Sequence, residues 1–306
     1  MGKIAFVFSG QGAQHPGMAQ DLIERYDRVA DLFAAADRIR PGTTEQCLRG
    51  TQEELKQTEN TQPCLYLADL AAAIALEEEG IVPQALAGFS LGEIAALAFG
   101  GAFSLEEGFS IVCRRGQLMG EANRQADTGM VAVVKMENAA VETLAQQFDR
   151  VYPVNYNCPG QLAVSGAKDS LEAFSVAVRQ AGGRAVPLAV SGAFHSPYMN
   201  DAAEAFGTFL QQKNLRMPEI PVYSNCTAQP YTEDIASLLT RQMNHPVQWE
   251  NTIRRLAKEG FDIFIETGVG TTLKKLIQKT LPDALIYAVE TAEEAAAIGQ
   301  EVLSHV

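Results

Sequence analysis

The sequence predicts an α/β protein in which helices cover both faces of a mostly parallel sheet and a small ferredoxin-like domain is inserted. Two observations predict this fold. Short apolar stretches alternate with helical patterns toward both ends of the 306-residue chain, which is typical of parallel sheets. In residues 127–191 the order becomes strand, helix, strand, strand, helix, strand, as in the ferredoxin-like split unit. We therefore expect a large domain from residues 1–126 and 192–306 and a small domain from residues 127–191.

The chain begins with a β-rich stretch, residues 3–8, that leads into a glycine-rich loop. The loop has Gly10 and Gly12 but lacks the third glycine of G-x-G-x-x-G and a G-K-[ST] ending, so neither nucleotide-binding motif is present. It therefore offers free backbone donors at the carboxyl end of a strand. Helical patterns follow over residues 18–36 and 53–79, with a boundary expected near residues 61–63.

Residues 85–93 hold the motif around which the chain is organised. An apolar strand over residues 85–88 runs into Gly88-Phe89-Ser90-Leu91-Gly92, and a helix is expected over residues 93–99. A serine at a sharp strand-to-helix turn is exposed, and the free N–H groups of the first helical turn point at whatever it attacks. Ser90 is thus a candidate nucleophile. A serine that merely caps the helix stays open as the alternative, because G-x-S-x-G is common.

A helix predicted over residues 105–123 carries an arginine on its apolar face. The apolar stripe consists of Leu105, Phe109, Val112 and Met119. Arg115 falls inside this stripe and needs an anionic partner, because an unpaired buried charge is costly. A structural ion pair, or a side chain that snorkels to the surface, would also meet that need.

The remaining elements complete both domains. In the small domain we expect strands over residues 129–136, 151–157, 161–166 and 184–190 and helices over residues 139–148 and 168–181. Beyond it we expect a helix ending near residue 212, strands over residues 222–225, 262–265 and 284–289, and helices over residues 235–243, 249–258, 272–279 and 292–303. A cleft between an inserted and a main domain is a common substrate site.

Four histidines are available to activate Ser90, and elimination favours His195. His305 lies in the terminal tail, His15 follows the glycine-rich loop, and His245 lies in an Asn-His-Pro turn. His195 stands where the chain returns to the large domain, among small residues that allow close approach. An imidazole with a pKa of about 6.5 can take the serine proton and return it to a leaving group. A helix-entry histidine bonded to backbone is the alternative.

Composition limits the class of protein. Without a secretory signal or a membrane-length apolar stretch, we expect a soluble protein of the cytoplasm. The five cysteines are scattered without a C-x-x-C, which argues against a zinc site or a disulfide framework. The net charge of −13 argues against non-specific nucleic-acid binding, and an acidic partner would need a local basic patch.

An α/β-hydrolase would share the serine turn but would add an acidic triad residue and an H-G-G-G-type oxyanion loop. No H-G-G-G run is present, and Gly10-Gln11-Gly12 is the candidate oxyanion loop. A neutral ester has no anionic group that an inward-facing Arg115 could bind. The arginine fits a substrate that carries its own carboxylate.

Seven motifs stand in order along the chain: Gly10-Gln11-Gly12-Ala13-Gln14, Thr61-Gln62-Pro63, Gly88-Phe89-Ser90-Leu91-Gly92-Glu93, Arg115-Gly116, Asn157-Cys158-Pro159-Gly160-Gln161, Gly192-Ala193-Phe194-His195-Ser196 and Arg241-Gln242-Met243-Asn244-His245-Pro246-Val247. Together they resemble the malonyl-CoA:acyl carrier protein transacylase family, relatives of the acyltransferase domains of polyketide synthases. The resemblance covers essentially the whole chain and implies a hydrolase-like α/β core with a ferredoxin-like insert. Two departures are Phe89, where many relatives have histidine, and Val269, where the family turn E-x-G-P-G has proline.

The resemblance implies a catalytic dyad. Ser90 would attack the malonyl thioester of coenzyme A, and His195 would act as general base and then acid. The backbone carbonyl of Gln242 would orient His195 in place of a triad carboxylate. Backbone N–H groups of Gln11 and Leu91 would form the oxyanion hole.

The resemblance also implies how the substrates are held. Arg115 would bind the malonyl carboxylate in a bidentate pair. The other pocket residues would be Gln62, Met119, Asn157 and Phe194, the last typical of malonyl-selective members. The malonyl group would pass from Ser90 to the phosphopantetheine thiol of acyl carrier protein in a ping-pong cycle, with coenzyme A as a product and no cofactor or metal.

Acyl carrier proteins are strongly acidic, so we look for a basic surface. Residues 251–280 have a local charge balance of 6 − 3 = +3. The six cations are Arg254, Arg255, Lys258, Lys274, Lys275 and Lys279. A set of solvated helix faces is the alternative to a docking surface. A serine esterase or thioesterase, a trans-acting polyketide acyltransferase and a catalytically silent carrier-binding subunit stay open as other functions.

Overall fold

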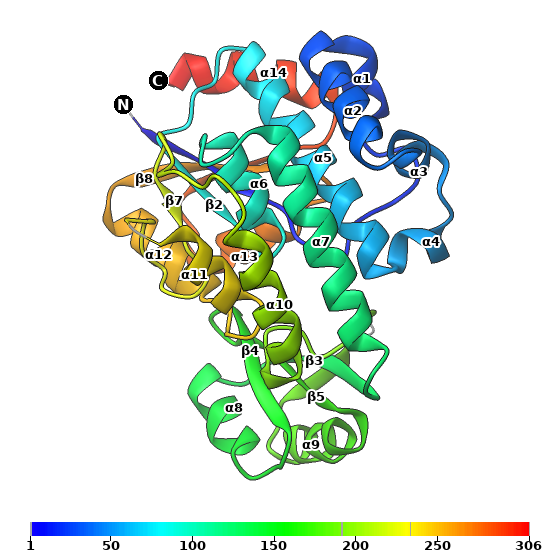
Figure 1. Cartoon of the computed structure of the whole chain (residues 1–306). Helices are drawn as coiled ribbons and strands as arrows, with labels where there is room; N and C mark the ends of the chain where they lie inside the picture. Colours follow the sequence, from blue (N-terminus) through cyan, green and yellow to red (C-terminus); the bar gives the residue numbers. More distant parts are fainter. Residues whose placement is uncertain (1, 191, 233, 306) are drawn as a thin grey trace.

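A five-stranded parallel sheet forms the centre of the large domain (Figure 1). The computed structural model describes residues 2–190, 192–232 and 234–305. The strand order is β7-β2-β1-β8-β9, and every neighbouring pair is parallel. The strands are β1 (Lys3–Phe8), β2 (Ala85–Gly88), β7 (Val222–Tyr223), β8 (Phe261–Thr267) and β9 (Leu285–Val289). Because parallel strands end at the same edge, the loops after β1, β2 and β8 meet there.

Helices cover both faces of this sheet, as the alternating pattern predicts. On one face, Phe6 and Phe8 belong to the core that includes α5 (Thr58–Glu78), α6 (Gly92–Phe99) and α14 (Ala292–His305). On the other face, Ala5 and Val7 pack with α12 (Trp249–Lys258) and α13 (Thr272–Thr280). None of the described helices is long and apolar enough to cross a membrane.

The other helices of the large domain surround this core. α7 (Leu105–Asn123) packs against α5 and runs from the large domain toward the small one (Figure 1). The rest are α1 (Gln20–Arg25), α2 (Asp27–Ile39), α3 (Thr43–Arg49), α4 (Gln52–Lys56), the short 3₁₀ helix Pro197–Met199, α10 (Asn200–Leu210) and α11 (Ile235–Gln242).

The small domain is a four-stranded antiparallel sheet in the order β4-β5-β3-β6, which confirms the ferredoxin-like prediction. Its elements are β3 (Thr128–Val134), α8 (Asn138–Ala145), β4 (Val151–Cys158), β5 (Gln161–Ala167), α9 (Lys168–Gln180) and β6 (Arg184–Pro187). Val131 and Val133 face α8 and α9, whereas Met130 and Ala132 turn toward the large domain. The expected domain limits remain a prediction, and the limit residue Ser191 lies outside the described residues.

Several predicted elements differ in their bounds; the last strand of the small domain, for example, ends at Pro187 and not at residue 190. The helical pattern over residues 18–36 is two helices, because Tyr26 has an extended backbone and donates its hydroxyl to Glu79. The boundary expected near residues 61–63 falls at Gln57, and Pro63 lies buried inside α5, where it removes one backbone hydrogen bond of the helix. β3 ends at Val134 because the next residue, Lys135, has a φ of 62°.

Candidate active site

Ser90 lies in the turn between β2 and α6 with a φ of 54°. A Cβ on Gly88 would lie 2.0 Å from the carbonyl oxygen of Gly92, so the chain can double back here only with glycine. The Ser90 N–H donates to Asn225 Oδ1 over 2.7 Å, and Asn225 Nδ2 donates to the Gly88 carbonyl over 2.6 Å. These two bonds hold the serine in a strained backbone conformation that presents its hydroxyl.

His195 is hydrogen-bonded to this serine. Its Nε2 lies 2.8 Å from Ser90 Oγ, and its Nδ1 lies 2.7 Å from the backbone carbonyl of Gln242. Since a carbonyl oxygen only accepts, Nδ1 carries the proton and Nε2 is left to accept from the serine. Burial, and then the charge of Arg115, lower the pKa of His195 to about 3. The imidazole is therefore neutral near pH 7, as a general base requires.

The guanidinium of Arg115 lies directly beside the nucleophile. The side chain is 1% exposed, and its Nη2 donates to Ser90 Oγ over 3.2 Å. Nη2 also donates to Gln242 Oε1 over 2.8 Å, and Nη1 donates to Gln62 Oε1 over 2.9 Å. Burial lowers the pKa of Arg115 to about 10 while the charge of Glu93 raises it, so the group stays cationic near pH 7.

Arg115 has unused capacity to bind an anion. Its buried Nε has no hydrogen-bond partner, and no carboxylate forms an ion pair with it in the described part of the chain. The structural ion pair and the snorkelling side chain that the sequence left open are therefore absent. A buried cation held only by neutral acceptors is suited to an anionic ligand.

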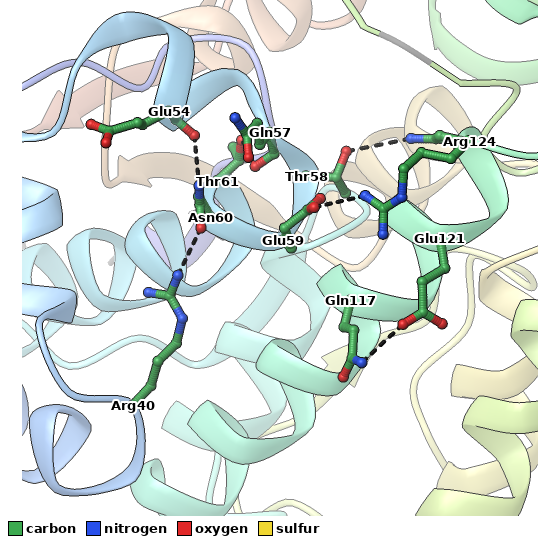
Figure 2. Close-up of polar contacts among 11 residues, drawn as sticks. Arg40, Glu54, Gln57, Thr58, Glu59, Asn60, Thr61, Gln117, Glu121 and Arg124 are labelled. Atoms are coloured by element: carbon green, nitrogen blue, oxygen red, sulfur yellow. Dashed lines mark hydrogen bonds and ion pairs between the residues drawn. The ribbon is translucent and has the colours of Figure 1, made fainter.

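The first turns of α5 and the last turns of α7 are tied together, and this fixes Gln62 against Arg115. Figure 2 shows the ion pair between Glu59 of α5 and Arg124, the residue directly after α7; the two side chains are 2.8 Å apart. One turn deeper, Gln62 Nε2 donates to the side-chain oxygen of Gln11 over 3.2 Å while its own oxygen accepts from Arg115. The Gln62 amide thus bridges the glycine-rich loop and the buried cation.

The two expected oxyanion donors flank the serine. Gln11 lies in the loop after β1, and Leu91 directly follows Ser90 at the start of α6. Neither main-chain N–H has an acceptor among residues 2–190, 192–232 and 234–305. Free N–H groups on two loops at one sheet edge are what a developing oxyanion needs.

A cavity of about 200 Å³ opens between the two domains at this point. Five of the predicted site residues line it: Gln11, Ser90, Asn157, Phe194 and His195. The other five, Gln62, Leu91, Arg115, Met119 and Gln242, are not on its wall and are buried behind it. A larger cavity of about 760 Å³ beside α9 contains none of the predicted site residues.

The small domain contributes two further polar groups to the cavity wall. Asn155 and Asn157 alternate along β4, and each is 8% exposed. The side-chain oxygens of both have no hydrogen-bond partner within the described residues. The sequence singled out Asn157 but missed Asn155, although two asparagines at i and i+2 on one strand share a face.

Sequence reasoning also missed the residues that hold the dyad in place. Asn225 follows β7 at the edge where the parallel strands end, which is the one sequence signal that could have identified it. Sequence reasoning assigned the buried Glu93 no role beyond its place as the last residue of the serine motif. For Gln242, the resemblance implied a role for the backbone carbonyl and none for the side chain that contacts Arg115.

Phe89 replaces the histidine that many relatives carry before the serine. Its ring packs edge-on against Trp249 with the centroids 5.5 Å apart, and Phe89 lines the cavity. An apolar contact with α12 therefore occupies this position in the present chain.

A parallel α/β sheet with a serine elbow, a histidine held by a backbone carbonyl and a buried arginine beside them defines the class of serine-dependent acyltransferases. The comparisons agree, because the family described as "Acyl transferase domain" matches residues 5–301. The chain belongs to this family and, within it, to the malonyl-CoA:acyl carrier protein transacylases.

Relatives and solved structures match over almost the full length. The malonyl CoA-acyl carrier protein transacylases of Bacillus subtilis (strain 168) and Staphylococcus aureus (strain COL) are each 35% identical over 96% of this chain and over 98% and 97% of their own. The Clostridium perfringens transacylase structure has a TM-score of 0.94 at 31% identity, covering 99% of this chain and 100% of that one. A malonyl-transacylase solved with a type II polyketide synthase acyl-carrier protein has a TM-score of 0.93 at 30% identity, covering 98% and 99%.

Proposed function

We propose that this chain transfers a malonyl group from malonyl-CoA to the phosphopantetheine thiol of acyl carrier protein through a malonyl ester on Ser90. The observation that carries the proposal is the contact between Arg115 and Ser90 Oγ at 3.2 Å. It brings a cation without an anionic partner next to a nucleophile. A malonyl thioester has a carboxylate and a reactive carbonyl one methylene apart, so it can engage both groups at once.

In the first half-reaction, His195 Nε2 accepts the proton of Ser90 as Oγ bonds to the thioester carbonyl carbon. The resulting oxyanion accepts hydrogen bonds from the N–H groups of Gln11 and Leu91, each worth roughly 3–4 kcal/mol in such sites. The C–S bond then breaks, and imidazolium returns the proton to the coenzyme A thiolate. Coenzyme A leaves as a product, and the reaction needs no cofactor or metal, because both substrates supply the groups that react.

Arg115 binds the malonyl carboxylate from its position beside Ser90, and its buried Nε is a donor without a partner in the described residues. A charge-assisted bond of this kind contributes about 1.5–3 kcal/mol. An acetyl group would leave the buried guanidinium unpaired, which disfavours it. The bound carboxylate also offsets the Arg115 charge, which is one of two causes of the low pKa of His195. Malonyl binding therefore makes His195 a stronger base when it is needed.

The pantetheine arm lies along β4 in this proposal. Its amide N–H groups match the partnerless oxygens of Asn155 and Asn157, which need donors. Both coenzyme A and the carrier bring the same arm, so one channel serves both half-reactions. Phe194 lines the same cavity and limits the space beside the acyl group.

The acidic carrier docks beside the cavity mouth on α13. Thr272, Leu273 and Leu276 of α13 line the cavity, and Lys279 Nζ donates to Gln161 Oε1 over 3.2 Å. Lys275 is exposed on the same helix. These contacts support the α13 half of the expected surface, Lys274, Lys275 and Lys279.

The α12 half of that surface, Arg254, Arg255 and Lys258, fits the carrier less well. Arg254 pairs with Glu250 over 2.8 Å and Arg255 pairs with Glu259, so both charges are partly neutralised. All three line a separate hollow that contains no residue of the catalytic cavity. We also place the reaction in the cytoplasm, where the five free cysteines would stay reduced.

Mass spectrometry of the intact chain mixed with malonyl-CoA tests the function. A transacylase gains one malonyl adduct on Ser90, and holo-carrier protein then removes it and becomes malonylated. Ser90→Ala should abolish the adduct. Consumption of malonyl-CoA without an adduct would point to a thioesterase, and no reaction at all to a silent carrier-binding subunit. Either result would contradict the proposal.

A further inference from the structure

The Glu93 carboxyl group is fully buried, and no step of the proposed reaction uses it. Burial raises its pKa to about 7, whereas the hydrogen bonds from Tyr231, Gln242 and Asn225 and the charge of Arg115 favour its ionised form. Glu93 lies in the first turn of α6 with 0% exposure. Its Oε1 accepts from the Tyr231 hydroxyl over 2.6 Å and from the Asn225 N–H over 3.1 Å, and its Oε2 accepts from Gln242 Nε2 over 2.9 Å. No cation forms an ion pair with it in the described part of the chain. Burying a carboxylate without a cation is costly, and its three hydrogen bonds offset only part of that cost.

The amide of Gln242 connects this carboxylate to Arg115. Gln242 Nε2 donates to Glu93 Oε2 and, over 2.5 Å, to the Ser90 carbonyl. The amide oxygen therefore points the other way and accepts from Arg115 Nη2 over 2.8 Å. An amide has its donor and acceptor on opposite sides, so whichever group fixes one side fixes the other. A donor in place of Glu93 Oε2 would oppose this orientation of the amide, and the Ser90 carbonyl alone would then support it.

The same carboxylate also reaches the nucleophile and the base. Asn225, whose N–H bonds to Glu93, accepts from the N–H of Ser90. Gln242, whose side chain bonds to Glu93, accepts from His195 Nδ1 through its backbone carbonyl. Asn225, Tyr231 and Gln242, all distant from Glu93 in the sequence, thus converge on one carboxyl group.

We propose that Glu93 is a positioning residue that makes the site selective for acyl groups bearing a carboxylate. It orients Gln242, and Gln242 in turn holds Arg115 at Ser90 while leaving the guanidinium without a direct anionic partner. A carboxylate in direct contact with Arg115 would compete with the substrate. With one amide between them, Glu93 offsets part of the guanidinium charge in the free protein and leaves its donors for malonyl. The charge of Glu93 acts against the effect of burial on the pKa of Arg115, in line with this arrangement. The inference rests on the proposed function.

Glu93→Gln tests it, because the substitution keeps the shape and removes the charge. We expect kcat/KM for malonyl-CoA to fall about 10- to 100-fold, as for the loss of a hydrogen bond to a charged group. The loss should appear mainly in KM, and acylation by acetyl-CoA should change much less. The measured quantity is the ratio of the two kcat/KM values, which a general loss of stability leaves unchanged.

Tyr231→Phe is the matched control. It removes another buried hydrogen bond to the same carboxylate but leaves the bonds between Gln242 and Arg115 in place. We expect a comparable fall in Tm with an unaltered malonyl-to-acetyl ratio. A double-mutant cycle with Gln242→Leu should be strongly non-additive in that ratio, because Glu93 acts through Gln242.

An unaltered ratio in Glu93→Gln would overturn the inference and leave Glu93 a purely structural group. If that variant does not fold, Glu93→Asp keeps the charge and withdraws it by one methylene from Gln242, and the same fall in the ratio is expected. A wild-type chain that never transfers malonyl would instead refute the proposed function. The two failures are therefore distinguishable.

Discussion

Arg115 Nη2 lies 3.2 Å from Ser90 Oγ, although 25 positions separate the two residues in the sequence. The cation that would bind a carboxylate and the oxygen that would attack a thioester are thus in contact before any substrate arrives. This arrangement suits short diacids, because only a short spacer lets one molecule reach both atoms. The predictions below follow from this contact and from the groups around it.

Arg115→Ala should lower malonyl transfer about 100-fold or more, because a buried charge pair with the substrate is lost. Acylation by acetyl-CoA, or hydrolysis, should rise relative to malonyl transfer. Arg114→Ala is the control, since it makes the same change one position away, where the side chain bonds only to Gln117 among the described residues. Steady-state kinetics with both thioesters provide the measurement, and undiminished malonyl turnover in Arg115→Ala would exclude the assignment.

His195 should stay neutral across the physiological range. Burial and the Arg115 charge lower its pKa to about 3, so its NMR resonances should not titrate between pH 5 and 8. His15 is the internal comparison: burial lowers its pKa, but bonds to the Pro16 carbonyl and to Glu290 outweigh this and raise it above 6.5. A His195 resonance that titrates near the value of a free imidazole would contradict the description of the site.

The low pKa of His195 also predicts how stability depends on pH. Between about pH 6.5 and pH 3 the unfolded chain binds a proton that the folded chain does not, so this residue makes the free energy of unfolding fall as pH falls. His195→Gln removes this contribution. The free energy of unfolding of this variant, measured from denaturant unfolding curves, should therefore fall less on acidification than that of the wild type. Equal falls in the two proteins would contradict the low pKa of His195.

Asn155→Ala and Asn157→Ala should each raise KM for malonyl-CoA about 2- to 10-fold, the range for loss of a neutral hydrogen bond, with little change in kcat. Ser165→Ala is the control, because Ser165 is also buried without a side-chain partner but does not line the cavity. With a malonyl thioester of a short thiol that lacks the distal amide of pantetheine, KM should change less in at least one of the two variants. Unchanged KM in both variants would contradict the proposal that the pantetheine arm lies along β4.

Charge reversal at Lys274 and Lys275 should raise KM for the carrier and weaken the salt dependence of transfer, while acylation by malonyl-CoA stays the same. Reversal at Arg254 and Arg255 should have a smaller effect, because both are ion-paired. Stopped-flow transfer at several ionic strengths separates the two helices. If charge reversal on α12 and on α13 changed carrier KM and salt dependence equally, the carrier would dock on both helices, as the sequence suggested.

Local patterns predicted a large part of this fold. The bounds of α7 and α12 agree with the expected ranges, because each has an apolar stripe or cap that is complete within one segment. The break at Tyr26 was not predictable, since it depends on a hydroxyl bond to Glu79, which lies 53 residues away in the sequence. Contacts of that kind leave no periodicity in the sequence.

The candidate site divides in the same way. Ser90, His195 and Arg115 were identified because a tight turn, a domain junction and a charge on an apolar face are visible in short stretches. Glu93, Asn225 and the Gln242 side chain were not, because their roles exist only where segments 132 and 149 residues apart meet. A carboxylate on a helix is usually solvated, but the rest of α6 is apolar on every face, and this local signal for burial was not used.

The sequence by itself determined the fold class and singled out Ser90, His195 and Arg115 as candidates, since turn geometry and side-chain periodicity are local properties of the chain. Tertiary structure alone decided which way the Gln242 amide faces, which oxygens on β4 lack partners, and which lysines lie beside the cavity. These depend on distances between residues far apart in the sequence. Only the folded backbone sets those distances, and hydrogen bonds are lost within an ångström of misplacement.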